Sequence, residues 1–305
     1  MPPIPIISHP DYDISVPAGH RFVGQKFSDL MTYLAQQPYW VGFDVIQTRP
    51  VHLSNLRAVH DVDYIADFAY NRLDNTALRR LGLPWSQRLL KRSFLAVNGT
   101  YQAAQLALQR GIACHAAGGT HHAHRSYGSG FCVFNDLAFA AHALIRHHSV
   151  RRVLILDLDV HQGDGTIDIC TQNPALFTAS LHGENNFPFE KRQGSLDITL
   201  TDGLGDDAYL AILAEALDRI WAEFEPELVI YDAGVDVHAD DGLGRLSLSY
   251  DGILQRDMHV MEFFKSRNIP VTTAIGGGYS RDRSELARRH SIVFAAAHAV
   301  YGTSP

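Results

Sequence analysis

Residues 153–165 read VLILDLDVHQGDG, an apolar run that ends in chelating side chains at every second position. In a β-strand, successive side chains point to opposite faces. Asp157, Asp159 and His161 would therefore share one face, and the aliphatic residues between them would fill the other. Charged groups at the end of so apolar a strand are costly to bury unless they are paired or bind a cation. The pattern favours a metal site over a strand that simply emerges into solvent.

The composition of the whole chain is typical of a folded globular protein. The 305 residues are 46% hydrophobic and 19% charged, with a formal net charge of −7 that argues against a nucleic-acid partner. No linker, charge block or repeat marks a boundary, so we expect one domain over residues 1–305. The three cysteines show no paired spacing, and no segment is typical of a secretory signal or a membrane span. The expected location is therefore the cytoplasm.

Strand and helix patterns alternate along the chain, which predicts a parallel sheet with helical crossovers. The expected strands are 5–8, 112–116, 153–159, 176–181, 228–232 and 270–275. The expected helices are 27–36, 59–72, 98–110, 135–148, 207–224, 251–266 and 284–301. In such sheets, sites form beyond the carboxyl ends of the strands.

A tandem histidine pair, His121 and His122, follows a glycine pair at the end of strand 112–116. Neutral imidazole can accept a proton near neutral pH and imidazolium can return it, which suits acid–base catalysis. Considered alone, two exposed loop histidines are an equally good interpretation. The nearby His115 and His124 have no such context, and we expect both to be structural.

Two more strand ends carry polar side chains. After strand 228–232 come four aspartates, of which one could complete a three-ligand zinc set with Asp159 and His161. These aspartates are Asp232, Asp236, Asp240 and Asp241. The others would be turn formers or helix caps. After strand 270–275, three glycines precede Tyr279, whose phenol could donate to a developing oxyanion or merely cap the core edge.

Four strings, in this order and at these separations, resemble the zinc-dependent histone deacetylase family. They are GGTHHAHRSYGSGFCVFND (118–136), DLDVHQGDGT (157–166), DAGVDVHADDGLGRLSLS (232–249) and AIGGGY (274–279). The resemblance runs from about His20 to the end of the chain. It implies an arginase-like α/β fold: a single three-layer α/β/α domain around a central, mostly parallel eight-stranded sheet.

The resemblance also implies which residues bind metal ions. The zinc ligands would be Asp159, His161 and Asp236, which selects one of the four aspartates left open above. A structural potassium ion would lie nearby. Its site would be formed by Asp157, Asp159, His161, Ser180 and Leu181.

Catalytic roles follow from the same resemblance. His121 and His122 match the family's tandem histidines, with His122 as general base and acid. Asp157 would accept a hydrogen bond from His121, and Asp164 from His122. Tyr279 would polarise the acyl carbonyl together with the zinc ion. Gly130 and Phe131 match the wall of the tunnel that holds the substrate's methylene chain.

Within the family, the chain most resembles the class IV and bacterial deacetylase-like branch. Gln162 stands where class I enzymes have a second histidine, and the loop HGENNFPFEKRQGS (182–195) replaces a longer aromatic loop. Tyr279 is present where branches weak against acetyl-lysine have histidine. Because the class IV branch includes lysine defatty-acylases, a long fatty acyl group is one hypothesis for the substrate.

The expected function is hydrolysis of the amide of an acylated amine, above all an N6-acyl-lysine (acetyl or longer) of a protein or peptide. Acetylated polyamines and small acetyl amides are alternatives, as are a two-manganese ureohydrolase and a non-catalytic acyl-lysine-binding protein. The ureohydrolase site needs a further aspartate where this chain has Gly163. Nothing in these motifs indicates an oligomeric state.

Overall fold

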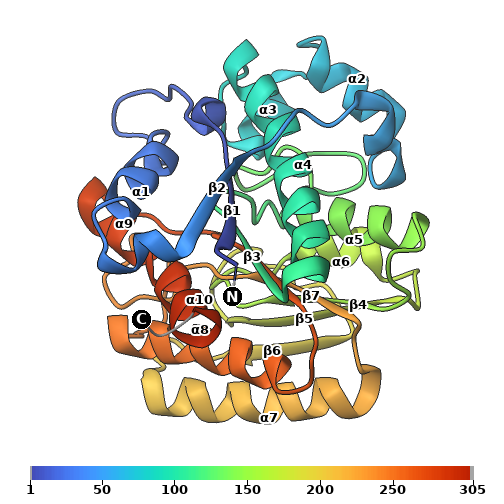
Figure 1. Cartoon of the computed structure of the whole chain (residues 1–305). Coiled ribbons are helices and arrows are strands. Elements are labelled where there is room, and N and C mark those ends of the chain that lie inside the picture. The colour runs from blue at the N-terminus through green and yellow to red at the C-terminus, as the bar shows by residue number, and fades with distance from the viewer. Residues whose placement is uncertain (1, 303–305) are drawn as a thin grey trace.

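A single parallel sheet of eight strands runs through the computed structural model, which describes residues 2–302 (Figure 1). Its order is β2-β1-β3-β8-β7-β4-β5-β6, and every paired strand runs parallel to its neighbour. The strands are β1 (Ile4–Ser8), β2 (Phe43–Gln47), β3 (Ile112–His115), β4 (Val153–Asp157), β5 (Leu176–Gly183), β6 (Leu196–Leu200), β7 (Leu228–Asp232) and β8 (Val271–Ala274). The predicted arginase-like α/β fold is confirmed.

Helices cover both faces of this sheet. α4 and α5 pack on one face, and α7, α8 and α10 on the other (Figure 1). The helices are α1 (Lys26–Leu34), α2 (Val62–Ala69), α3 (Asn75–Leu81), α4 (Gln87–Arg110), α5 (Asp136–Arg146), α6 (Asp164–Cys170), α7 (Asp206–Phe224), α8 (Tyr250–Lys265), α9 (Arg283–His290) and α10 (Ile292–Tyr301). Short 3-10 turns occur at Pro10–Tyr12, Pro38–Gly42 and Leu53–Ala58.

The register of the central strands brings the polar strand ends to one level. Asp157 at the end of β4 lies opposite Asp232 at the end of β7 and opposite Ser180 in β5. All five residues of β4 and of β7 are buried, because helices cover both faces of the sheet. The loops that leave β4, β7, β3 and β8 therefore meet at one edge of the sheet.

Several element boundaries differ from the sequence prediction. The helix predicted over 98–110 begins at Gln87, where the Ser86 hydroxyl accepts a hydrogen bond from Leu89 N at 3.0 Å. Asn98, where the helix was predicted to begin, therefore lies inside α4. The helix predicted over 284–301 is two helices separated at Ser291.

Other elements were missed or too long in the prediction. Both edge strands, β2 and β6, are only partly buried and mix apolar with polar residues, so neither has a strong apolar run. The strand predicted over 153–159 ends at Asp157, and α6 follows after a short loop. Asp159 and His161 thus lie in a loop and not on the face of a strand. The helix predicted over 59–72 is shorter, covering only α2.

Among residues 2–302, the structure has no helix that is both long enough and apolar enough to span a membrane. The three cysteines, Cys114, Cys132 and Cys170, are free and buried. Neither finding tests the predicted cytoplasmic location.

Candidate active site

The histidine pair lies in a loop whose backbone is held by a buried carboxylate. Asp136, the first residue of α5, accepts hydrogen bonds from Gly119 N at 3.1 Å and from Thr120 N at 2.7 Å. Gly119 has φ +77°, and a Cβ there would lie 2.5 Å from the Cα of Gly276. A side chain at this position would therefore separate two of the loops that form the site.

Each histidine of the pair donates to its own aspartate, as the resemblance implies. His121 Nδ1 lies 2.8 Å from Asp157 Oδ2, and His122 Nδ1 lies 2.6 Å from Asp164 Oδ1. The two imidazole centroids are 4.1 Å apart. Because carboxylates only accept hydrogen bonds, both Nδ1 atoms carry a proton, which directs each Nε2 away from its aspartate.

Beside the pair, three further side chains converge on one point. His161 Nδ1 lies 3.0 Å from Asp159 Oδ1 and 3.0 Å from Asp236 Oδ2. All three residues are buried, and they form a group whose ligand atoms lie within 4.8 Å of one another. The structure thus brings together the three predicted zinc ligands from the loops after β4 and β7.

This donor set fits a divalent cation. His161 Nδ1 can carry one proton, but two carboxylate oxygens lie within hydrogen-bond distance of it. Burial and the neighbouring charge of Asp159 raise the pKa of Asp236 above its usual range. A bound metal ion would compensate these buried charges, and one imidazole with two carboxylates matches the open, three-ligand site of catalytic zinc.

The two adjacent histidines have opposite electrostatic surroundings. Although burial opposes it, the charges of Asp157 and Asp159 raise the pKa of His121 well above its usual range. Burial and the positive charge of His121 lower the pKa of His122 to about 4. Near neutral pH, His121 is therefore the cation, and His122 is the one of the two that can accept a proton.

Tyr279 completes the group from the loop after β8. Its backbone N–H donates to Asp241 Oδ2 at 2.7 Å, and its ring centroid lies 6.3 Å from that of His161. Burial and the nearby charges of Asp236 and Asp159 raise the pKa of the phenol well above its usual range. Tyr279 therefore keeps its proton and can act as a hydrogen-bond donor.

Two aromatic rings lie near His122 and Tyr279. The Phe131 ring lies 5.9 Å from that of Tyr279, and a Cβ at Gly130 would lie 2.5 Å from the His122 ring. The Phe187 ring meets the His122 ring edge to face, with centroids 4.9 Å apart. Gly130 and Phe131 thus lie next to His122 and Tyr279, and their role as a tunnel wall stays a prediction. The sequence analysis gave Phe187 no role.

The residues predicted for a potassium site also lie close to the zinc group. Ser180 pairs with Asp157 between β5 and β4, and Leu181 follows it in β5. The Ser180 hydroxyl contacts His182 Nδ1 at 2.9 Å. A potassium ion at this place stays a prediction.

Asp232 is not the turn former that the sequence suggested. It is the last residue of β7 and is fully buried, and neither carboxylate oxygen has a hydrogen-bond partner within residues 2–302. Its Oδ2 lies 3.7 Å from His121 Nδ1. With Asp157 it forms a second group of metal-ligand type, but His121 Nδ1 already donates to Asp157 and is not free to bind an ion. Asp241 does form a turn, since it accepts from Leu243 N and Gly244 N.

Arg256 is a second residue that sequence reasoning missed, because it lies in the middle of a helix pattern. Its fully buried guanidinium donates from Nη1 to Leu158 O at 3.1 Å and to Gly234 O at 2.7 Å. Asp257 neutralises it, with Nη2 and Oδ1 2.8 Å apart. Arg256 therefore ties together the two loops that supply the metal group.

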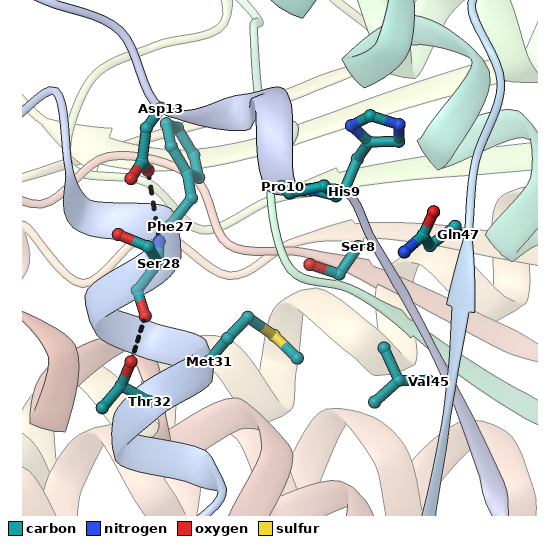
Figure 2. A pocket seen from close by; sticks show the side chains of 10 residues that line it. All are labelled: Ser8, His9, Pro10, Asp13, Phe27, Ser28, Met31, Thr32, Val45 and Gln47. Atoms are coloured by element: carbon teal, nitrogen blue, oxygen red, sulfur yellow. Dashed lines mark hydrogen bonds between the residues drawn. The ribbon is translucent and has the colours of Figure 1, made fainter.

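A separate depression of about 350 Å³ lies between α1 and the β1–β2 edge of the sheet (Figure 2). Met31 and Val45 are among its lining residues, and none of the predicted site residues lines it. This depression is therefore distinct from the candidate active site.

Comparison with known proteins agrees with the site geometry. A protein-family model described as the histone deacetylase domain matches residues 20–296 of this chain. An uncharacterized protein of Picosynechococcus is 43% identical over 97% of this chain and 99% of its own length. Histone deacetylase 2 of Arabidopsis thaliana is 30% identical over 93% of this chain and 76% of its own length.

A solved structure supports the same assignment. The crystal structure of a histone deacetylase homologue complexed with SAHA superimposes with a TM-score of 0.83 at 26% identity, covering all of this chain and 85% of that one. The class IV placement stays a prediction. The chain therefore belongs to the histone deacetylase family and is a hydrolytic deacetylase.

Proposed function

We propose that the protein hydrolyses the amide of N6-acetyl-lysine in a protein or peptide, in a reaction that depends on zinc. The observation that carries the proposal is the convergence of Asp159, His161 and Asp236 beside His122 and Tyr279. A zinc ion held by the first three residues supplies Lewis-acid chemistry and lowers the pKa of a bound water when it is present.

The chain's own residues account for the proton transfers. His122 is neutral near pH 7, with Nδ1 bonded to Asp164 and Nε2 free to take a proton from the attacking water. The same nitrogen then returns the proton to the departing amine. Tyr279 keeps its proton and donates a hydrogen bond to the acyl oxygen as negative charge develops there. The raised pKa of His121 favours a positive charge beside His122, which opposes early protonation of His122.

The space beside these groups favours a short acyl group. The cavity among His122, Phe131, Tyr279 and the inner residues Phe22 and Lys26 measures about 30 Å³. A cavity needs about 10–15 Å³ to hold one water molecule, so this one has room for a small group and not for a long chain. A long fatty acyl chain would need the buried side chains to move. We therefore propose acetyl over the fatty acyl groups suggested by the class IV resemblance.

The flanking aromatic rings support a lysine side chain as the carrier. Phe187 packs on His122 and Phe131 lies beside Tyr279, and aromatic rings next to these groups suit an unbranched methylene stem. Outside them, a groove of about 930 Å³ lined by residues of loop 187–193 offers space for the rest of a peptide. Acetylated polyamines have a similar stem but would leave this groove empty.

The ureohydrolase alternative is poorly supported by the packing around Gly163. A Cβ at this position would lie 2.3 Å from Asp157 Oδ2, so an aspartate for a second metal would not fit without rearrangement. One ion per chain is therefore expected, with Ser180 and Leu181 kept as the proposed potassium residues. Metal analysis of the purified protein distinguishes one zinc from two manganese ions per chain.

The deciding experiment compares substrates on the zinc-loaded protein. Release of acetyl, octanoyl and myristoyl groups from the same lysine peptide is measured beside acetylated spermidine. We expect kcat/KM to be highest for the acetyl peptide and activity to be lost in Tyr279→Phe with zinc still bound. A higher kcat/KM for myristoyl or for the polyamine would contradict the proposed substrate, and no hydrolysis of any would contradict the proposed function.

A further inference from the structure

Asp164 joins the proposed general base to a third histidine. Its Oδ1 lies 2.6 Å from His122 Nδ1, and its Oδ2 lies 3.1 Å from His124 Nε2. Asp164 is the first residue of α6 and is mostly buried, with 7% of its surface exposed. Although burial opposes it, the hydrogen bonds from His122 and His124 lower the pKa of Asp164 below its usual range. Asp164 is therefore an ionised acceptor shared by two histidines.

His124 continues the chain towards the surface. Its Nδ1 lies 3.1 Å from Asp168 Oδ2, and the other oxygen of Asp168 lies 3.3 Å from Arg192 Nη1. Both ring nitrogens of His124 thus face carboxylates, which only accept hydrogen bonds. An N–H on Nε2 donates to Asp164, so the ring of His124 links Asp164 to Asp168.

The position of the His124 ring is fixed by its neighbours. It stacks on Tyr127 with centroids 4.3 Å apart, and the Arg80 guanidinium lies 3.8 Å from the centre of the Tyr127 ring. His124 N donates to Tyr127 O at 2.9 Å, and His124 O contacts His60 Nδ1 at 2.9 Å. At 2% exposure, His124 has little freedom to turn. A ring held this firmly can hold Asp164 in turn.

We propose that His124 is a positioning residue for His122 and acts through Asp164. By binding Oδ2, it fixes the carboxylate plane so that Oδ1 meets His122 Nδ1, which keeps the proton on Nδ1 and leaves Nε2 free. Without His124, Oδ2 loses its partner in a mostly buried place, and the Asp164 side chain can rotate away from His122. The inference rests on the proposed function, because it assigns His124 a part in the work of His122.

The geometry also makes the inference testable by chemical rescue. His124, Asp164, Asp168 and Arg192 all line the groove of about 930 Å³ beside the approach to His122. An imidazole molecule added to the His124→Ala variant can therefore reach the space that the side chain leaves. If His124 contributed only to folding, added imidazole would not restore kcat.

The main experiment measures kcat and KM of zinc-loaded variants on the acetyl-lysine peptide. His124→Ala is expected to lower kcat by about tenfold or more with KM little changed, as for other outer partners of catalytic groups. Added imidazole and the His124→Gln variant, whose amide can still donate to Asp164, should each restore part of kcat. Asp168→Asn should lower kcat less than His124→Ala, since it removes only the outer link.

A double-mutant cycle tests the route through Asp164. In an Asp164→Asn background, His124→Ala should lower kcat by less than about twofold, because the link it supports is already broken. His142→Gln, a half-buried histidine in α5, is the matched control and should keep the parent kcat. Equal kcat losses from His124→Ala in both backgrounds would contradict the inference, as would an unchanged kcat in the single variant.

A measurement without turnover separates the two proposals. In ring-¹⁵N-labelled, zinc-loaded protein, His122 should be the Nδ1–H tautomer, and His124→Ala should increase its Nε2–H form. If the parent protein hydrolyses no acyl-lysine, the proposed function fails, and the tautomer shift still tests the link through Asp164. If the parent is active and His122 keeps its tautomer in the variant, only the inference about His124 is wrong. If His124→Ala does not fold, kcat and the His122 tautomer are measured in Asp168→Asn and His124→Gln instead, and these values test the inference.

Discussion

The floor and the mouth of the site are built from different parts of the chain. The floor consists of the strand-end residues that surround the metal group, among them Asp159, Asp236 and His122, and all of these are buried. The mouth is formed by Phe131 and by the loop around Phe187 and Phe189. Phe187 is 36% exposed, and Phe189 is 86% exposed. The parallel sheet fixes the positions needed for chemistry, whereas exposed loops decide what can approach. Substitutions in the floor should therefore have larger effects than those in the mouth.

The largest effect is expected from His122→Ala. Loss of a positioned general base and acid typically lowers the rate by about 10²–10⁴-fold, so kcat on the acetyl-lysine peptide should fall by about 10³-fold. Zinc content should be unchanged, because the three proposed ligands are Asp159, His161 and Asp236. Steady-state kinetics with metal analysis on the same sample check both points. A kcat within tenfold of the parent value would mean that another group acts as the base.

Arg256→Met should have the next largest effect, on stability. It removes the partner of Asp257 and leaves that carboxylate buried without its counter-charge, which typically costs about 3–5 kcal/mol. It also releases the carbonyls of Leu158 and Gly234, which precede two of the metal ligands. Urea unfolding measures the free energy of unfolding, and zinc titration of the folded variant measures affinity.

The double variant Arg256→Met with Asp257→Leu is the matched control. It removes both charges and should recover part of the lost stability, because no unpaired carboxylate remains. Zinc affinity should stay low, since the two carbonyls are still released. Recovery of parent affinity would show that Arg256 does not hold the two loops.

The floor could largely be predicted from the sequence because its residues lie in compact strings after strands. Asp159 and His161 follow β4 directly, and His121–His122 follow β3, so the rule for the carboxyl ends of parallel strands brings them together. The choice of Asp236 among four aspartates depended on the family resemblance. Spacing alone treated Asp159 and His161 as strand residues, and the structure places them in a loop.

The remaining contacts join residues too far apart in the sequence for local patterns to reveal. Arg256 reaches Leu158 across 98 positions, from a helix whose pattern predicts only packing. Phe187 meets His122 from an irregular loop, where periodicity carries no signal. His124 received a structural role because its partner Asp168 belongs to α6, a helix that the sequence analysis did not predict.

Asp232→Asn tests the least expected feature of the floor and should raise stability. Burial and the charge of Asp157 raise the pKa of Asp232 well above its usual range, so the folded protein holds this proton more tightly than the unfolded chain. The folded state therefore loses stability as pH rises from the unfolded pKa of about 3.9 towards the raised value. Asparagine does not ionise in this pH range, so the variant avoids this loss of stability.

The expected gain is at least about 1 kcal/mol at neutral pH, since each pKa unit is worth about 1.4 kcal/mol. Near pH 4 the parent and Asp232→Asn should differ least, and the difference should grow as pH rises. Urea unfolding at a series of pH values measures it. A parent protein that is more stable than Asp232→Asn at pH 7 would mean that the ionised carboxylate has a compensating partner.

Phe189→Ala, in the mouth, should have the smallest effect. Its ring is 86% exposed and lies 6.4 Å from Phe187 between centroids, so the free energy of unfolding should change by less than about 0.5 kcal/mol. If loop 187–193 holds the peptide, KM for an acetyl-lysine peptide should rise while kcat stays the same, because the floor is untouched. KM for free N-acetyl-lysine, which cannot reach the groove, should not change. Tyr70→Ala serves as the control, because it removes a ring that is 71% exposed and does not line the groove. Equal KM changes for the peptide and the free amino acid would mean that the mouth does not distinguish protein substrates from small acetyl amides.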